Sequence, residues 1–205
     1  MKKTLIVTYT PRIDSNTKKL VDYFVTYNQD NTNIEVLDLV ETTPDLLLEV
    51  NLNLFLKRNY VGMALEDEEV QALEKNDFML QQVLDADFIV LAYPMFNFSL
   101  PATVKAWIDA ITQAGKTFKL TETGYAGLCE NKNALVLMTT GNDFGVEPAK
   151  SMNFATPLIG LQLGFIGIPS EHITAFGLQQ YPDKLSSILE DSKQEIKSLS
   201  DSWYS

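Results

Sequence analysis

The stretch Phe88-Ile89-Val90-Leu91-Ala92-Tyr93 decides the fold class, because six residues follow one another without a charged or amide side chain. A strand that is apolar on both faces is typical of the centre of a parallel sheet, where helices cover both sides. A second run of this kind lies at 134–138, and further strand-like runs lie at 4–9, 34–39 and 173–176. The sequence therefore predicts a sheet of five strands.

Segments with helical spacing of apolar residues alternate with these strands. Leu20, Phe24 and Tyr27 are spaced by four and three residues, which places them on one face of a helix over 17–28. Further helices are expected near 66–84, 101–113, 147–163 and 183–199. Alternating strands and helices indicate right-handed βαβ units, hence an α/β, three-layer, doubly wound parallel sheet.

Residues 42–65 fit no short connection between a strand and a helix. They carry many apolar residues, and we interpret them as a helix and loop inserted after the second strand. A connection of this length is usually functional or a contact surface. We expect one domain over residues 1–205, with 42–65 contributing to a subunit contact or a lid.

Charge and composition exclude several classes of function. The chain has 16 basic and 27 acidic residues, a net charge of −11, which argues against nucleic-acid partners and anionic membranes. One cysteine and one histidine leave no internal disulfide, CxxC pair or clustered metal ligands. No apolar run is long enough for a signal peptide or a membrane span, so we expect a cytoplasmic protein. Because the usual metal ligands are not clustered, we also expect no metal.

Three loops follow strands and can form one site, because ligands of open parallel sheets bind at the carboxyl ends of the strands. The first loop, 10–17, offers the hydroxyls of Thr10, Ser15 and Thr17 where a helix begins. Free amides at a helix start and the positive end of the helix dipole suit a phosphate. An ordinary polar turn, in which Ser15 or Asp14 caps the helix, explains the same residues.

The second loop, 94–101, is poor in polar groups and is bounded by two prolines. Its backbone amides could meet a planar heterocycle while its side chains enclose it, although a hydrophobic plug is the alternative. Ser99 is the expected N-cap of the next helix, with Pro101 in its first turn. The third loop, 139–145, contains glycines and an asparagine that permit close approach to a ligand, but it also suits a plain turn.

The remaining reactive side chains fit structural roles better than catalytic ones. Trp107 lies on an apolar helical stripe and is expected in the core or a subunit interface. Cys129 is expected to be a buried, inert thiol, and His172 is expected at the start of the fifth strand. With no triad and no nucleophile elbow, any chemistry should come from a bound cofactor.

The middle of the chain resembles the FMN-dependent NADH-azoreductase family, which is related to the NAD(P)H:quinone oxidoreductases and has the flavodoxin-like fold. The resemblance rests on residues 94–102, 105–109, 114–118 and 163–168, and it spans nearly the whole chain. It implies FMN as the cofactor, NADH or NADPH as the electron donor, and a homodimer. The implied reaction is a ping-pong, two-electron reduction of quinones or azo compounds by hydride transfer through the flavin.

The resemblance also implies which residues hold the flavin, with no catalytic side chain of their own. The FMN phosphate would be held by Thr10, Ser15, Asn16 and Thr17. The isoalloxazine would be lined by Pro94, Met95, Phe96, Asn97 and Phe98, of which Phe96, Asn97 and Phe98 shape the substrate site. The other side of the ring would be closed by Thr139, Thr140 and Gly141.

Two positions depart from the family pattern. The resemblance implies that both lie on the substrate side of the flavin. Asn142 stands where a second glycine is common, and Leu120 stands where a tyrosine is frequent. Both departures bear on the choice of electron acceptor more than on FMN binding. The rival interpretations are a one-electron carrier of the flavodoxin type that serves protein partners, and a fold that has lost its cofactor and acts structurally.

Overall fold

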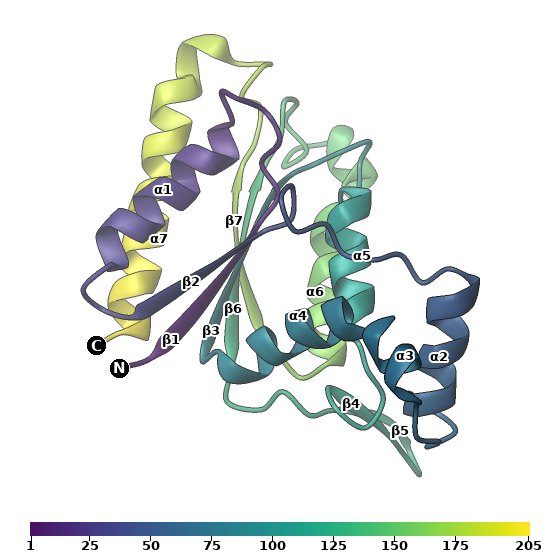
Figure 1. Cartoon of the computed structure of the whole chain (residues 1–205). Helices are drawn as coiled ribbons and strands as arrows, with labels where there is room; N and C mark the ends of the chain where they lie inside the picture. Colours follow the sequence, from purple (N-terminus) through teal and green to yellow (C-terminus); the bar gives the residue numbers. More distant parts are fainter.

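The computed structural model describes residues 1–205 and has a central sheet of five parallel strands, in the order β2-β1-β3-β6-β7 (Figure 1). The strands are β1 Lys3–Thr8, β2 Asn33–Asp38, β3 Phe88–Pro94, β6 Asn133–Thr139 and β7 Ser170–Ala175. The predicted α/β doubly wound sheet is therefore confirmed. Central β3 pairs with β1 on one side and β6 on the other, and residues 88–93 are all buried.

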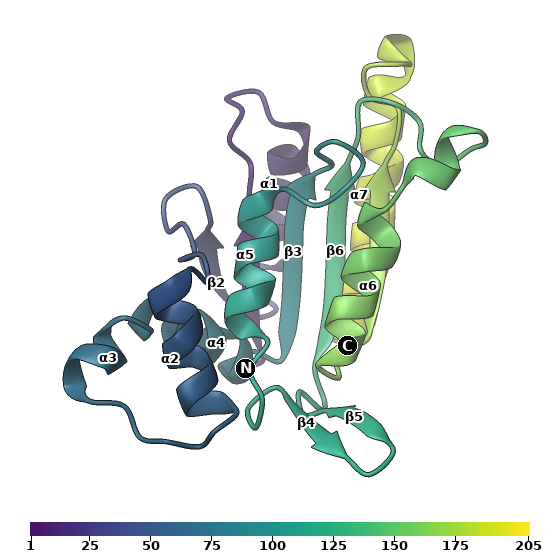
Figure 2. The same cartoon turned by 90° about the vertical axis from the view of Figure 1, so that its right-hand side faces the viewer.

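Helices cover both faces of the sheet (Figures 1 and 2). One face carries α1 Asn16–Asn28 and α7 Leu185–Trp203, and the other carries α4 Glu74–Asp85, α5 Ala102–Ile111 and α6 Ala155–Phe165. Alternate residues of β3 divide between two apolar cores: Ile89 packs into the α4–α6 side, whereas Val90 packs into the α1–α7 side. This two-sided burial explains why the strand is apolar without interruption. None of the helices combines the length and the apolar composition that a bilayer crossing requires.

Two of the predicted helices differ from the sequence pattern, one by a break and one by its start. The helix predicted over 66–84 is two helices, α3 Asp67–Gln71 and α4, separated at Ala72 and the fully buried Leu73. The helix predicted over 147–163 begins only at Ala155, after a short 3-10 helix η1 Ala149–Met152. Asn153 Oδ1 accepts the amide of Thr156 at 3.1 Å, which fixes that start.

The fifth strand and one hairpin also differ from the prediction. Strand β7 begins at Ser170, so His172 lies in its middle and Phe176 lies outside it. The antiparallel hairpin of β4 Phe118–Thr121 and β5 Gly124–Gly127 was not predicted, because strands of four residues give little alternation. A 3-10 helix, η2 Pro182–Lys184, leads into α7.

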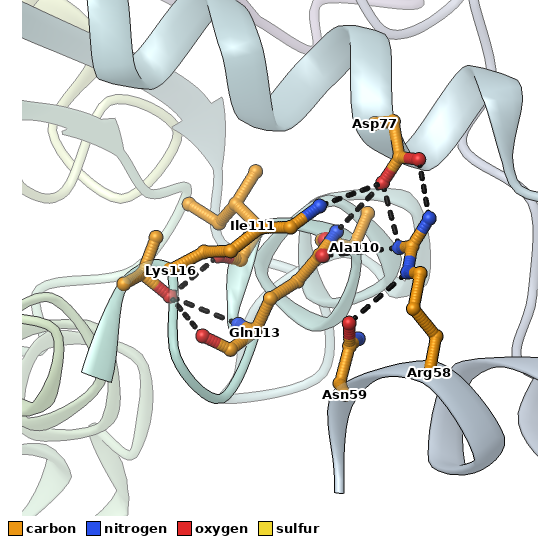
Figure 3. Close-up of polar contacts among 8 residues, drawn as sticks. Arg58, Asn59, Asp77, Ala110, Ile111, Gln113 and Lys116 are labelled. Carbon is orange, nitrogen blue, oxygen red and sulfur yellow. Dashed lines mark hydrogen bonds and ion pairs between the residues drawn. The ribbon is translucent and has the colours of Figure 1, made fainter. Parts of the chain in front are cut away.

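The segment after β2 contains helix α2 Glu49–Asn59, within the predicted insertion at 42–65. The end of this helix is attached to the body of the protein by Arg58, whose guanidinium binds both oxygens of Asp77 on α4 at 2.5 and 2.7 Å (Figure 3). Arg58 also donates to Gln113 Oε1, just beyond α5, at 3.2 Å. Partial burial raises the pKa of Asp77, but Arg58 outweighs it, aided by Lys116 and Gln113, and the pKa stays below its ordinary value.

Candidate functional site

The loops that follow β1, β3 and β6 meet at the carboxyl ends of the strands and enclose a pocket of about 220 Å³. Nine of the twelve residues predicted for the site line it: Ser15, Asn16, Thr17, Pro94, Met95, Phe96, Thr139, Thr140 and Gly141. The other three, Thr10, Asn97 and Phe98, belong to the same loops but do not line the pocket. The structure adds four residues that the sequence did not single out: Pro11, Arg12, Leu178 and Gln179.

The first loop ends in a capped helix start. Ser15 is extended, and its Oγ accepts the amide of Lys18 at 3.2 Å, so the predicted cap is present. The capping bond leaves other first-turn amides of α1 without an intrahelical partner, so the cap and an anion site are compatible. The Thr17 hydroxyl shares a hydrogen bond of 2.7 Å with that of Thr139, and both side chains are buried. This bond joins the first loop to the third.

The second loop contains a tight turn that the sequence did not predict. Phe96 and Ser99 exchange backbone hydrogen bonds of 3.0 and 2.9 Å, and Asn97 and Phe98 between them have φ values of 47° and 70°. Two successive left-handed residues are typical of a type I′ turn. Ser99 is therefore a turn residue, and its prediction as the N-cap was wrong: α5 begins after Pro101, without a side-chain cap.

The left-handed conformation is costly for Phe98 because of its Cβ, by about 1–2 kcal/mol. Strain of this kind persists only where the surroundings fix it, and it concentrates at ligand sites. The turn leaves Phe96 41% and Phe98 45% exposed beside the pocket, although α5 and β3 on either side are well buried. Phe98 has one aromatic neighbour, Phe144 of the third loop, in an edge-to-face contact at 5.8 Å.

A fourth segment, 176–181 after β7, supports the third loop. The amides of Gln179 and Gln180 both donate to the carbonyl of Gly141, at 2.9 and 3.0 Å, and Gln180 Oε1 accepts the amide of Asp143. A Cβ on Gly141 would lie 2.8 Å from Gln179 Oε1, so the Gln179 side chain lies against this glycine. This segment was not predicted, because residues 176–181 lack the serine and threonine hydroxyls and the paired prolines that mark the first two loops. The rule that ligands bind at strand carboxyl ends would have included it.

The charge of the pocket differs from that of the protein. No aspartate or glutamate lines it, and Arg12 is its one charged residue, although the whole chain carries −11. The two lysines of the first turn do not line the pocket: Lys18 pairs with Asp22 at 2.7 Å, and Lys19 Nζ donates to Oδ1 of the lining residue Asn16 at 2.8 Å. The pocket thus combines hydroxyl and amide groups at one end with Pro94, Met95 and Phe96 at the other.

The other residues singled out in the sequence lie outside the pocket. Trp107 is fully buried in the core, and burial raises the pKa of the Cys129 thiol, so it is protonated and shielded. Burial lowers the pKa of His172, whose Nε2 makes a hydrogen bond of 3.0 Å with Ser170 Oγ. No group of three or more His, Cys, Asp or Glu side chains is placed to hold a metal ion.

The two departures from the family pattern lie in different places. Asn142 follows Gly141 in the third loop, next to the pocket lining. Leu120 is 75% exposed on β4, which lies beyond the carboxyl end of α5, whereas the second loop precedes the amino end of the same helix (Figure 2). Leu120 therefore lies away from the pocket of its own chain, and its effect on the choice of electron acceptor stays a prediction.

Comparisons with known proteins agree with this architecture. The model of a family described by its flavodoxin-like fold matches residues 2–199. An FMN-dependent NADH:quinone oxidoreductase from Bacillus cereus is 35% identical over 92% of both chains, and one from an Exiguobacterium species is 34% identical over 97% of this chain and 95% of that protein.

Solved structures show the same similarity. An azoreductase from Bacillus anthracis str. Sterne superposes with a TM-score of 0.90 at 29% identity, over 98% of this chain and all of that one. An FMN-dependent NADH-azoreductase from the same species, solved in complex with FMN, has a TM-score of 0.87 at 23% identity over the full length of both chains, and it supports the fold. The chain therefore belongs to the flavodoxin-like family, among the FMN-dependent NADH:quinone oxidoreductases and azoreductases.

Proposed function

We propose that this protein is an FMN-dependent oxidoreductase that takes two electrons from NADH or NADPH and reduces quinones or azo compounds. The main support is the pocket at the strand ends. It has hydroxyls and a helix start at one end, apolar side chains at the other, and no carboxylate. This arrangement suits a molecule with an anionic tail and a flat apolar ring. Relatives that match over nearly their whole length are named as FMN-dependent oxidoreductases.

The residues fit FMN in the following way. The phosphate would lie at the start of α1, against Ser15, Asn16 and Thr17, with the hydroxyl of half-buried Thr10 in the same loop. The ring would lie between the second and third loops, which contribute Pro94, Met95, Phe96, Thr139, Thr140 and Gly141. Asn97 and Phe98 would meet the outer part of the ring from the turn at 96–99.

The protein itself would bind and orient the flavin and the reactants, and it would exclude water from between them. Bound FMN would supply the two-electron chemistry. The strained turn holds the side chains of Phe96 and Phe98 as an exposed apolar surface beside the pocket, on which planar nicotinamides, quinones and azo compounds can stack. The lining contains no aspartate, glutamate, histidine, cysteine, lysine or tyrosine that could act as a general acid, so protons would come from water.

A homodimer is part of this proposal, and helix α6 supports it. Its sequence Ala155-Thr156-Pro157-Leu158-Ile159-Gly160-Leu161-Gln162-Leu163-Gly164-Phe165 has no charged residue, yet Leu161 is 71% exposed. A helix that is apolar on all sides is normally buried. The half-buried Gln162 has an Oε1 without a hydrogen-bond partner, in a groove between α5 and α6 lined by Ile108 and Phe165. A second copy of the chain would cover this groove.

The insertion at 42–65 and the hairpin of β4 and β5 would contribute to the same contact. Both expose large apolar side chains, among them Leu48 at 67%, Val61 at 67% and Leu120 at 75%. In a dimer these surfaces would contact the partner, and we propose that they contribute to its site. A cytoplasmic location completes the proposal, since the chain's single cysteine is a free, buried thiol.

Loading the protein with FMN and adding NADH tests the proposal. We expect absorbance at the flavin band to bleach without oxygen, and NADH oxidation to become continuous when menadione or an azo dye is added. A one-electron carrier would bind FMN but would not oxidise NADH with either acceptor. A structural protein would not bind FMN. The names of this chain's relatives do not favour a one-electron carrier. The pocket at the strand ends argues against a purely structural role.

A further inference from the structure

The proposed phosphate site must hold an anion in a protein whose own net charge is negative. A phosphate monoester carries about −1.5 to −2 charges at neutral pH. The protein carries −11, and a field of that sign repels an anionic ligand. Amides at the start of α1 offer only partial charges. A full positive charge near the phosphate would offset the repulsion.

Arg12 is the only cation of the first loop and the first helical turn whose side chain lines the pocket. The chain contains two arginines, Arg12 and Arg58, and Arg58 is bound to Asp77. Lys18 and Lys19 are held by Asp22 and Asn16. Arg12 lines the pocket with Ser15, Asn16 and Thr17, and its guanidinium takes part in no side-chain hydrogen bond or ion pair of the structure.

The surroundings of Arg12 also favour an anion over an internal partner. The pocket lining contains no carboxylate, and Asp14 of the same loop is exposed and lies outside it. A planar guanidinium matches the geometry of phosphate oxygens and binds them through two parallel hydrogen bonds. The loop has no glycine at 10–17, and Pro11 restricts the backbone immediately before Arg12.

We propose that Arg12 binds the 5′-phosphate of the flavin and thereby makes this protein selective for FMN over riboflavin. This inference rests on the proposed function. It assigns to Arg12 a binding role that the sequence pattern of hydroxyls did not reveal. It also predicts that the arginine acts on the phosphate alone, so its contribution disappears when the ligand has no phosphate.

A cycle that removes the arginine and the phosphate separately tests this role. The full-length apoprotein, wild type or Arg12→Ala, is titrated with FMN and with riboflavin at low salt, and quenching of flavin fluorescence gives each Kd. We expect Arg12→Ala to weaken FMN binding by about threefold to tenfold, because Arg12 is exposed and solvent screens its charge. Riboflavin binding should change by less than about twofold, and Arg12→Lys should restore part of the FMN affinity.

The matched control is Lys18→Ala, which removes a nearby cation that is already paired with Asp22. It should leave both Kd values within about twofold of wild type. Added salt should weaken FMN binding more in the wild type than in Arg12→Ala. Equal losses for FMN and riboflavin, or no loss for either, would overturn the role of Arg12. A wild-type protein that binds neither flavin would instead overturn the proposed function itself.

Discussion

Gly127 shows how tightly a single residue can be constrained by its neighbours. A Cβ built on Gly127 would lie 2.2 Å from the backbone nitrogen of Gly167 and 2.4 Å from the carbonyl carbon of Ile166. Contacts this short involve backbone atoms, which cannot turn aside as a side chain can. The end of β5 and the turn after α6 therefore require glycine for their close approach.

We expect Gly127→Ala to lower the free energy of unfolding by about 1–3 kcal/mol, because the methyl group must displace backbone. Gly164→Ala is the matched control, since a Cβ on this residue of α6 has nothing within 4 Å. Alanine is the better helix former, so the control should be neutral or stabilising by up to about 1 kcal/mol. Urea denaturation measures both, and equal stability of Gly127→Ala and wild type would contradict the packing argument.

At the residue scale, the sequence predicted roles that depend on local chemistry. It identified Ser15 as a possible cap and placed Trp107 and Cys129 in buried positions, because capping and apolar burial follow from residue type and spacing. It misplaced Ser99, since the turn at 96–99 depends on two left-handed residues that are not glycine. Arg12 and Gln179 were not singled out, because their relevance comes from which loops meet in space.

At the scale of elements, periodicity predicted the five main strands but not every helix boundary. Strands such as β3 are marked by continuous burial, which composition reveals. The break between α3 and α4 was missed because Leu73 continues the apolar pattern while turning inward with non-helical dihedrals of φ −111° and ψ 1°. The hairpin of β4 and β5 was missed because one side of it is exposed and its strands are short.

The attachment of α2 through Arg58 and Asp77 makes a prediction about pH. Asp77 has a pKa below its ordinary value in the folded protein, so its pairing stabilises the fold above the unfolded pKa, near pH 4. That contribution is lost as the pH falls through the lower, folded pKa. Asp77→Asn should therefore cost about 1–3 kcal/mol of unfolding free energy at pH 7, and the difference from wild type should shrink below about pH 4.

Denaturant melts of the two proteins between pH 3 and 8 give this difference directly. Asp22→Asn is the matched control, because Asp22 forms an exposed i,i+4 pair with Lys18 that should contribute little at any pH. A constant difference between Asp77→Asn and wild type across the range would show that the charge of Asp77 is not what attaches α2.

At the scale of the whole molecule, the groove between α5 and α6 predicts a dimer. Leu161→Glu would place a charge in the proposed contact, where burial without a partner is costly. We expect wild type to have about twice the chain mass of 23.0 kDa by light scattering, and the variant to shift toward a monomer. Val36→Glu, which replaces an exposed apolar residue on edge strand β2, should leave the mass unchanged. A monomeric wild type would refute the dimer.

We propose that the loops at the strand ends hold FMN, which would pass electrons from a nicotinamide to a small acceptor. The most direct test measures NADH oxidation by the FMN-loaded wild type, with and without menadione. We expect catalytic turnover that depends on both FMN and menadione. A fully loaded protein that leaves NADH unchanged, with menadione or an azo dye present, would contradict it.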